Sequence, residues 1–484
     1  MVSRNIGRGL RSVELLVERV FCEPLNTAVI FSDPLLDAAC QWLGKERLQA
    51  THRLRDISSL ETTGNMNRAD HDPAHPPHLV CIASKLQRSG GHTSVLADIL
   101  SAPNWRDRQV TVLLTGVGGI TKMDALQVRF SHLPHVRFER APRFSRLKKL
   151  DWLQRRLFEL QPADVMLLNH HQDSTAVAAV QPNQGYKVHY LHHGDHHLCL
   201  GVHLPYASHY DLHPTGFRNC RLHLGLEDNL YLPLTLTDVP ADDSGQLNQH
   251  DHETRPIVSC TVGGSNKIEM PYWLSYARLV PLLLAQTRGV HVHIGQLSLP
   301  YRLRILWALK RRGIALSRFK YLGQVDDVRS SLHHEGVDLY LTSFPYGGAK
   351  TMVEVMAARI PMAVHVHITH SFLSAIDMAP PLSLLWQTPQ QLLDWLSTQN
   401  PDSLSSKGRE ARRWYETNHL PSFFIDALDG KPRSPTQLQS LLTKSAWAPD
   451  ALSLAIETAR QFTIAGLVRR KWKFYGRLFL SSLS

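Results

Sequence analysis

Short apolar runs alternate with longer amphipathic segments along most of the chain. Runs at residues 78–83, 109–115 and 164–168 are rich in Val, Ile and Leu, and the second is followed by a turn of small residues at 116–119. Such runs predict strands buried on both faces, and the amphipathic segments between them predict helices. Strands that alternate with helices indicate a parallel, doubly wound α/β sheet.

The second half of the chain repeats this alternation after a polar interval. Strands are predicted at 256–262, 290–294 and 319–322, each ending in a polar or glycine-containing turn. Because the preceding segment lacks a periodic apolar face, it is predicted to be a linker. The domain prediction is a helical extension at 1–75, an N-terminal Rossmann-like domain at 76–236, a linker at 237–255, a C-terminal Rossmann-like domain at 256–430 and a helical tail at 431–484.

The stretch 337–366 predicts a complete βαβ unit. A strand at 337–341 precedes a turn of small residues, a helix beginning at Thr351 and a second strand after Pro361. In such units the loop after the strand opens at the carboxyl edge of the sheet, where backbone amides and the positive helix end hold phosphate. Glu354, one helical turn after Thr351, is suited to accept hydrogen bonds from sugar hydroxyls.

The segment DLYLTSFPYGGAKTMVEVMAARIPMAVH resembles the nucleotide-sugar loop of GT-B glycosyltransferases, in which the loop and the following acidic residue hold the diphosphate and ribose of the donor. It departs from the usual form at Arg359, which replaces a glycine. Phe344-Pro345-Tyr346 stands where retaining members carry the first Glu of a pair, so the resemblance is closer to inverting enzymes of the O-GlcNAc-transferase and bacterial protein-glucosyltransferase type.

The loop that follows residue 262, GGSNK, resembles the first loop of the GT-B C-terminal domain. The resemblance implies that Lys267 neutralises the leaving diphosphate, since departure of a nucleoside diphosphate places charge on the β-phosphate. A solvated loop lysine is the alternative reading. The predicted donor-binding residues are Gly264, Ser265, Lys267, Gly348, Lys350, Thr351 and Glu354.

Two histidine clusters follow predicted strands of the first domain, at 169–173 and 192–197. The second matches, at Asp195, His196, Leu200 and Gly201, an H-x-D-H-x-x-x-L-G motif of one group of bacterial GT-B enzymes. A histidine beside a carboxylate can act as a general base toward an acceptor hydroxyl. The predicted proton acceptors are Asp195, His196, His92 and His171, with hydrogen-bonded structural histidines as the alternative.

The same clusters allow a metal-dependent phosphoesterase or hydrolase as a rival function, because His and Asp are metal ligands. Asp195-His196-His197 spells the signature of DHH phosphoesterases, but the D-x-D that these enzymes need is absent from residues 79–115. The metallo-β-lactamase pattern H-x-H-x-D-H also fails, since residue 191 is Leu. We therefore expect no catalytic metal and no cofactor, the nucleotide sugar being a substrate.

The composition indicates which cellular compartment and which kinds of binding partner to expect. The formal charge of +11 favours contact with an anionic partner, which can be nucleotide phosphates, a phospholipid surface, an anionic glycan or nucleic acid, and the charge does not choose among them. A nucleic-acid partner is not expected, because no nucleic-acid module or stacking motif is present. The 6 cysteines lack regular spacing, which favours a reduced cytoplasmic compartment, and the basic, aromatic tail leaves open a position at the inner face of the cytoplasmic membrane.

Together these features predict a Leloir-type glycosyltransferase, a hexosyltransferase with two domains facing a cleft. Its expected acceptor is a glycan, a lipid-linked acceptor or a protein. Bacterial surface polysaccharide, lipopolysaccharide or glycoconjugate assembly is the expected setting.

Overall fold

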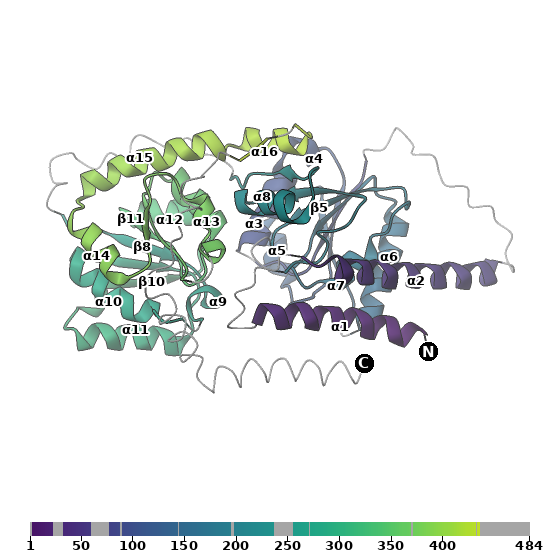
Figure 1. Ribbon diagram of the computed structural model, residues 1–484, viewed down its shortest axis with the longest axis horizontal. Coiled ribbons are helices and arrows are strands. Elements are labelled where there is room, and N and C mark those ends of the chain that lie inside the picture. Colours follow the sequence, from purple (N-terminus) through teal and green to yellow (C-terminus); the bar gives the residue numbers. More distant parts are fainter. Residues whose placement is uncertain are drawn as a thin grey trace.

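The structure is a computed structural model that describes residues 2–22, 32–59, 77–87, 90–143, 145–194, 198–236, 255–270, 272–368, 371–431 and 433–435. Two α/β domains lie side by side along the long axis of the molecule (Figure 1). The helices within these ranges are all too short or too polar to cross a bilayer.

A parallel seven-stranded sheet in the order β3-β2-β1-β4-β5-β6-β7 forms the centre of the first domain. Its central strands read as continuous apolar runs because helices cover both faces. In register, Leu79 lies opposite Val110 on one side and Asp164 on the other. The strands are β1 (Leu79–Ala83), β2 (Val110–Leu114), β3 (Val136–Arg140), β4 (Asp164–Leu168), β5 (Lys187–His192), β6 (Ala207–Asp211) and β7 (Leu230–Tyr231).

The helices of this domain form two layers. Buried residues of α1, α2, α6 and α7 share a core with one face of the sheet, and those of α3, α4 and α5 cover the other face. The predicted N-terminal extension is helical, and Leu10 and Cys40 show that its helices belong to the domain core. The helices are α1 (Val2–Cys22), α2 (Pro34–Ser59), α3 (Gly91–Ser101), α4 (Pro103–Arg106), α5 (Met123–Arg129), α6 (Arg146–Leu160), α7 (Ser174–Ala179) and α8 (Pro214–Leu224).

The second domain contains a parallel six-stranded sheet in the order β10-β9-β8-β11-β12-β13. Its strands are β8 (Ser259–Val262), β9 (His291–Ile294), β10 (Phe319–Gly323), β11 (Leu339–Leu341), β12 (Met362–His365) and β13 (Leu384–Trp386). Its helices are α9 (Ser265–Ile268), α10 (Tyr276–Thr287), α11 (Leu299–Arg311), α12 (Val328–His334), α13 (Ala349–Ala357), α14 (Pro389–Ser397), α15 (Pro401–Asn418) and α16 (Pro421–Leu428). Short 3-10 helices occupy Leu316–Arg318, Ser371–Ser374 and Ile376–Met378.

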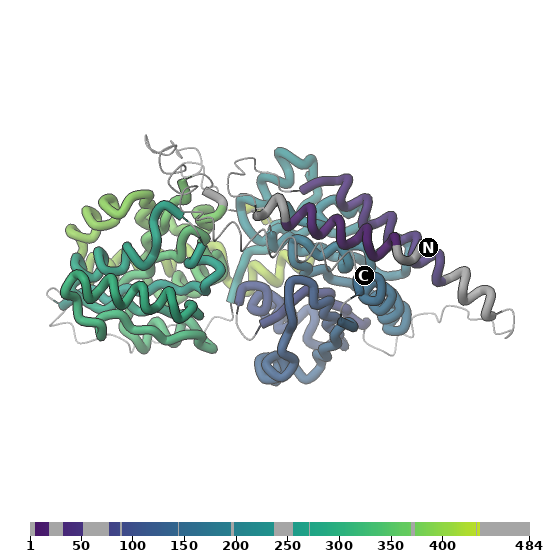
Figure 2. The backbone as a smooth tube through the Cα atoms, turned by 90° about the horizontal axis from the view of Figure 1, so that it is seen from below, coloured from purple at the N-terminus to yellow at the C-terminus, as the bar shows by residue number. Residues whose placement is uncertain are grey.

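Helix α15 runs along the second domain toward the first, and α16 lies against α4 of the first domain (Figure 1). In the perpendicular view the yellow end of the described chain lies within the blue domain (Figure 2). Asn104 of α4 donates a hydrogen bond to Asp429, directly after α16. The chain therefore crosses between the two domains a second time.

Candidate active site

In each sheet the strand order reverses once, between β1 and β4 in the first domain and between β8 and β11 in the second. Ligands of open α/β sheets bind outside the carboxyl ends of the strands at such switch points. Three of the loops that leave these points, after β1, β8 and β11, carry a pair of adjacent glycines, and the loop after β4 carries a histidine cluster. Sequence-predicted site residues lie on all four loops.

The loops after β8, β9 and β11 approach one another very closely. A Cβ at Gly263 would lie 2.9 Å from the Cβ of Ser343, and one at Gly295 would lie 2.4 Å from the carbonyl oxygen of Gly263. Gly295 also has a φ of +116°, which favours glycine. The glycines therefore allow backbone groups, rather than side chains, to form this part of the carboxyl edge.

Lys267 joins the first and third of these loops. It lies on α9, and its Nζ donates a hydrogen bond of 3.0 Å to the carbonyl oxygen of Gly347. A Cβ on Gly348 would lie 2.9 Å from this nitrogen, so a larger residue there would displace the end of the lysine side chain. Burial lowers the pKa of Lys267 to about 8, although the nearby Glu354 carboxylate opposes the shift. A partly buried ammonium is thus held among backbone groups.

Helix α13 begins beside this ammonium. The first amides of any helix have no intrahelical acceptor, and the N-cap of α13, Gly348, supplies no side chain to accept from them. Thr351 and Glu354 follow on the same helix face, both half-buried. Burial raises the pKa of Glu354 to about 7, partly opposed by Lys350. Among the residues that the structure describes, the Glu354 carboxylate has no hydrogen-bond partner.

The structure places Lys350 apart from this group. Its Nζ forms an ion pair with Asp98 of α3 and donates a hydrogen bond to the carbonyl oxygen of Thr235. Burial raises the pKa of Asp98, while the Lys350 charge opposes the shift. Lys350 therefore connects the two domains, and sequence reasoning missed Asp98 because the partners lie 252 residues apart.

Gly264 and Ser265 stand at the outer side of the first loop. Gly264 is the N-cap of α9 and is half-buried, and the side chain of Ser265 is exposed. The Ser265 amide donates a hydrogen bond of 2.8 Å to the carbonyl oxygen of Gln296. Of the seven predicted donor residues, the structure brings Lys267, Gly348, Thr351 and Glu354 together.

Histidines gather at the switch point of the first domain. The ring of His92, near the start of α3, contacts that of His193 at a tilt of 38°, with centroids 3.7 Å apart, and its centroid lies 6.1 Å from that of His170. The ring of His170 is in turn 4.1 Å from that of His171. Two of the predicted proton acceptors, His92 and His171, therefore belong to one cluster, and sequence reasoning had not assigned a role to His170 or His193.

Asp173 organises the loop that carries this cluster. Its carboxylate accepts hydrogen bonds from Ser84 after β1 and from Thr115 after β2, and it caps α7 through the Ala176 amide. The predicted acceptors Asp195 and His196 lie outside the described residues. Their placement stays a prediction.

The ion pair between Lys350 and Asp98 joins the two domains near the carboxyl edges of their sheets. His92 lies six residues before Asp98 on α3, which is about 9 Å along the helix axis. Lys350 and Thr351 are neighbours on α13, whose N-terminal turn contacts Lys267 through Gly348. The histidine cluster and the Lys267 group therefore lie near two helices, α3 and α13, that this ion pair joins.

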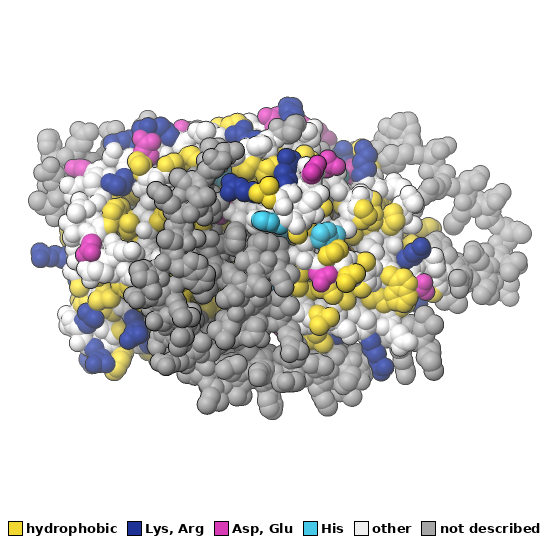
Figure 3. Space-filling model, in the orientation of Figure 1, with side chains coloured by type: hydrophobic (Ala, Val, Ile, Leu, Met, Phe, Trp, Pro, Cys, Tyr) yellow, Lys and Arg dark blue, Asp and Glu magenta, His cyan; other side chains and the backbone are white. Residues whose placement is uncertain are grey.

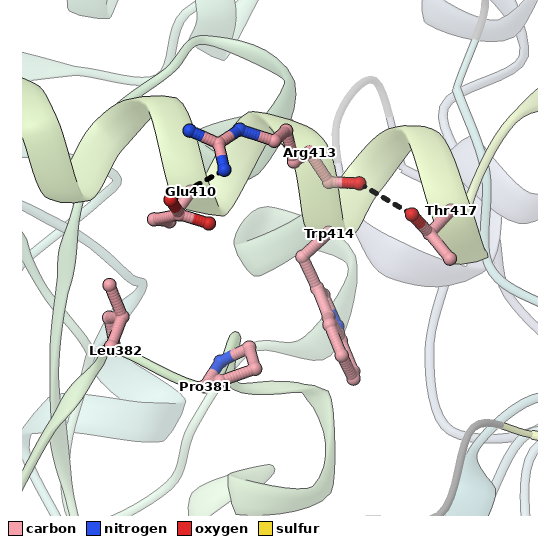
Figure 4. A pocket seen from close by; sticks show the side chains of 6 residues that line it. All are labelled: Pro381, Leu382, Glu410, Arg413, Trp414 and Thr417. Atoms are coloured by element: carbon pink, nitrogen blue, oxygen red, sulfur yellow. Dashed lines mark hydrogen bonds and ion pairs between the residues drawn. The ribbon is translucent and has the colours of Figure 1, made fainter.

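The molecule also has a small surface pocket of about 130 Å³ against α15. Figure 4 shows its lining, Pro381, Leu382, Glu410, Arg413, Trp414 and Thr417. None of these residues belongs to the glycine loops or the histidine cluster. The pocket is therefore not part of the candidate site.

Solved structures with the same arrangement identify the fold. HepE from Anabaena, solved with UDP and glucose, aligns over 72% of this chain and 98% of its own, with a TM-score of 0.53 at 14% identity. The lipopolysaccharide outer core galactosyltransferase WaaB in its apo form aligns over 73% of this chain and 99% of its own, with a TM-score of 0.52 at 15% identity. No family model and no curated protein matches the sequence. The chain has the GT-B fold, as its loops predicted.

Proposed function

We propose that this protein is a glycosyltransferase that moves a sugar from a nucleoside diphosphate to an acceptor hydroxyl. The observation that carries the proposal is the Lys267 ammonium, held between two glycine loops at a topological switch point and facing the open N-terminus of α13. An ammonium beside free helix amides is suited to a diphosphate. Retaining a charged group where burial disfavours it is typical of functional sites.

In the proposed mechanism, the α13 amides and Lys267 bind the donor diphosphate and stabilise the charge that develops on it as the sugar leaves. Glu354 accepts hydrogen bonds from the ribose hydroxyls. The acceptor hydroxyl approaches from the first domain and transfers its proton to Asp195 or His196, with His92 and His171 as alternatives. The C–O bond to the diphosphate breaks as the bond to the acceptor oxygen forms, and the electron pair departs with the diphosphate.

The setting of the reaction belongs to the same proposal. The candidate acceptors are a glycan, a lipid-linked acceptor or a protein, and lipopolysaccharide or other surface-glycan assembly is the proposed context. The charge of +11 supports peripheral contact with an anionic membrane, and we propose a cytoplasmic location at its inner face. On the face drawn in Figure 3, Lys and Arg side chains of the described residues are interspersed with Asp and Glu. This mixed pattern does not support a nucleic-acid partner on that face.

Calorimetric titration with UDP, GDP, CDP and dTDP tests the proposal. UDP is the first probe because HepE, at a TM-score of 0.50, was solved with UDP-glucose. We expect at least one nucleotide to bind and Lys267→Ala to weaken its binding at least tenfold. Lys310→Ala, which removes an exposed lysine at the end of α11, is the matched control and should leave affinity unchanged. The absence of binding for all four nucleotides would refute the proposal.

A further inference from the structure

A second chemical cluster lies inside the first domain, behind the histidines of the candidate active site. It consists of His192 at the end of β5, His209 and Asp211 on β6 and Cys220 on α8. All four side chains are buried, with 7% exposure for His209 and 1% or less for the others. Sequence spacing did not reveal the group, because three elements contribute to it.

The four potential ligand atoms converge on one point. The Asp211 Oδ1 atom lies 2.8 Å from His192 Nδ1, 3.2 Å from His209 Nε2 and 3.3 Å from Cys220 Sγ. The sulfur lies 3.5 Å from His192 Nδ1 and 3.7 Å from His209 Nε2. Tetrahedral Zn²⁺ with usual Zn–N, Zn–O and Zn–S bonds separates its ligand atoms by about 3.3 to 3.6 Å. The five observed separations scatter around that range, and all four ligand atoms lie within 4.8 Å of one another.

Hydrogen bonding alone accounts poorly for this arrangement. Three donors would share one carboxylate oxygen, which has two lone pairs. The other oxygen, Oδ2, already accepts a 2.5 Å hydrogen bond from Asn229, whose own amide oxygen is held by Arg221. Such a contact is typical of the outer partners that orient a metal ligand.

The charge of the cluster also favours a bound metal ion. Within the described residues, Asp211 forms no ion pair with any lysine or arginine, and its ionic contacts are with the two histidines. A buried carboxylate is costly unless it is paired or coordinates a metal. A divalent cation bound by Asp211 and the thiolate of Cys220 would make the buried site electrically neutral.

We propose that His192, His209, Asp211 and Cys220 form a closed tetrahedral site for a structural Zn²⁺ ion. The donor set of two imidazoles, one thiolate and one carboxylate suits zinc rather than magnesium or calcium. Because the site is buried and all four positions are filled by side chains, it has no open position for substrate. The ion fixes the end of β5, one residue before His193 of the active-site cluster, and ties it to β6 and α8.

Metal analysis of the intact full-length protein tests this inference. Protein produced in zinc-supplemented medium and purified without chelators should contain about one zinc per chain by elemental analysis. X-ray absorption should show one sulfur and three nitrogen or oxygen ligands. A zinc content far below one, or a shell without sulfur, would overturn the proposal and leave a hydrogen-bonded cluster.

Paired cysteine variants localise the ion. Cys220→Ser preserves a small hydrogen-bonding group and removes the thiolate, so it should lower the zinc content at least tenfold. Cys260→Ser is the matched control, because Cys260 is equally buried in the other sheet and should retain the metal. Equal zinc in the two variants would overturn the assignment. Zinc content and nucleotide affinity are measured in separate experiments. Failure of the zinc site can therefore be distinguished from failure of the proposed function.

Discussion

At the scale of single residues, the buried charge of Lys267 lowers the stability of the fold but is proposed to bind the nucleotide. Burial disfavours its charge, and the lowered pKa of about 8 means that the folded protein must bury a mostly charged ammonium at neutral pH. Lys267→Met should therefore raise the free energy of unfolding at pH 7 by about 1 kcal/mol, after solvent screening, while abolishing nucleotide binding. Denaturant unfolding and calorimetric titration check the two effects.

The control for this prediction is Lys310→Met, which removes an exposed lysine of α11 and should change neither quantity. A Lys267→Met protein that is less stable than wild type would show that the ammonium holds the two loops together. Its hydrogen bond to Gly347 would then be structural rather than a preparation for phosphate.

Glu354 makes stability depend on pH. Its pKa rises from 4.5 to about 7 on folding because of burial, so between these values the folded state holds a proton that the unfolded state has lost. The contribution of this group to stability is full below pH 4.5 and is lost as the pH rises toward 7. Glu354→Gln should match wild type near pH 4.5 and become increasingly more stable than wild type up to pH 7, with a constant difference above.

Thermal unfolding across pH 4.5 to 8 measures that difference. Glu227→Gln, at an exposed carboxylate after α8, should give a difference that does not change over this range. A Glu354→Gln curve parallel to wild type at every pH would contradict the burial argument and place the carboxylate in water.

At the scale of elements, the packing of the N-terminal helix α2 on α7 contributes to the stability of the first domain. Helix α2 crosses α7 at Gly44, where a Cβ would lie 1.9 Å from the carbonyl oxygen of Ala178. Gly-to-Ala changes within a helix usually stabilise it, but here the added methyl group meets backbone. Gly44→Ala should therefore cost about 2 kcal/mol of unfolding free energy.

The matched control is Gly7→Ala on α1, whose added Cβ would meet the Leu147 side chain at an ordinary 3.4 Å. This variant should be neutral or gain up to about 1 kcal/mol. Denaturant unfolding compares the two. Equal effects would mean that α2 does not pack closely on α7 in solution.

Sequence predicted the elements whose signals are local. The strand predicted at 164–168 is β4 as observed, and the helix predicted to begin at Thr351 is α13, which begins two residues earlier, at Ala349. Strand β6 was not predicted, because its sequence, ASHYD, carries a buried His and Asp where a core strand normally carries apolar side chains. Those polar residues contact each other and also β5, α8 and Asn229, and no local pattern shows these more distant partners.

The candidate site also contains features that local sequence predicts and features that depend on distant contacts. Glycine loops after strands are local features, so the group of Lys267, Gly348, Thr351 and Glu354 could be predicted from sequence. The pairing of Lys350 with Asp98 and the cluster around Asp211 depend on contacts between distant segments. Neither spacing nor composition indicates such contacts.

At the scale of the whole molecule, one buried ion pair reports on the contact between the domains. Lys350 and Asp98 have side-chain exposures of 9% and 13%, and their helices, α13 and α3, both contribute to one cluster of buried apolar residues from the two domains. Removing one partner of such a pair leaves a buried charge uncompensated and typically costs about 3 kcal/mol. Lys350→Met and Asp98→Asn should each cost about this much.

The double variant separates this interpretation from the predicted role of Lys350 in donor binding. If the pair is interdomain, the double variant should lose less stability than either single variant, because no charge is left unpaired. Nucleotide affinity should then fall less than threefold in Lys350→Met. Additive losses in stability, or a tenfold loss of affinity without a loss of stability, would mean that the ammonium turns toward the diphosphate. The contact between the domains would then rest on apolar packing and on the second crossing of the chain at α16.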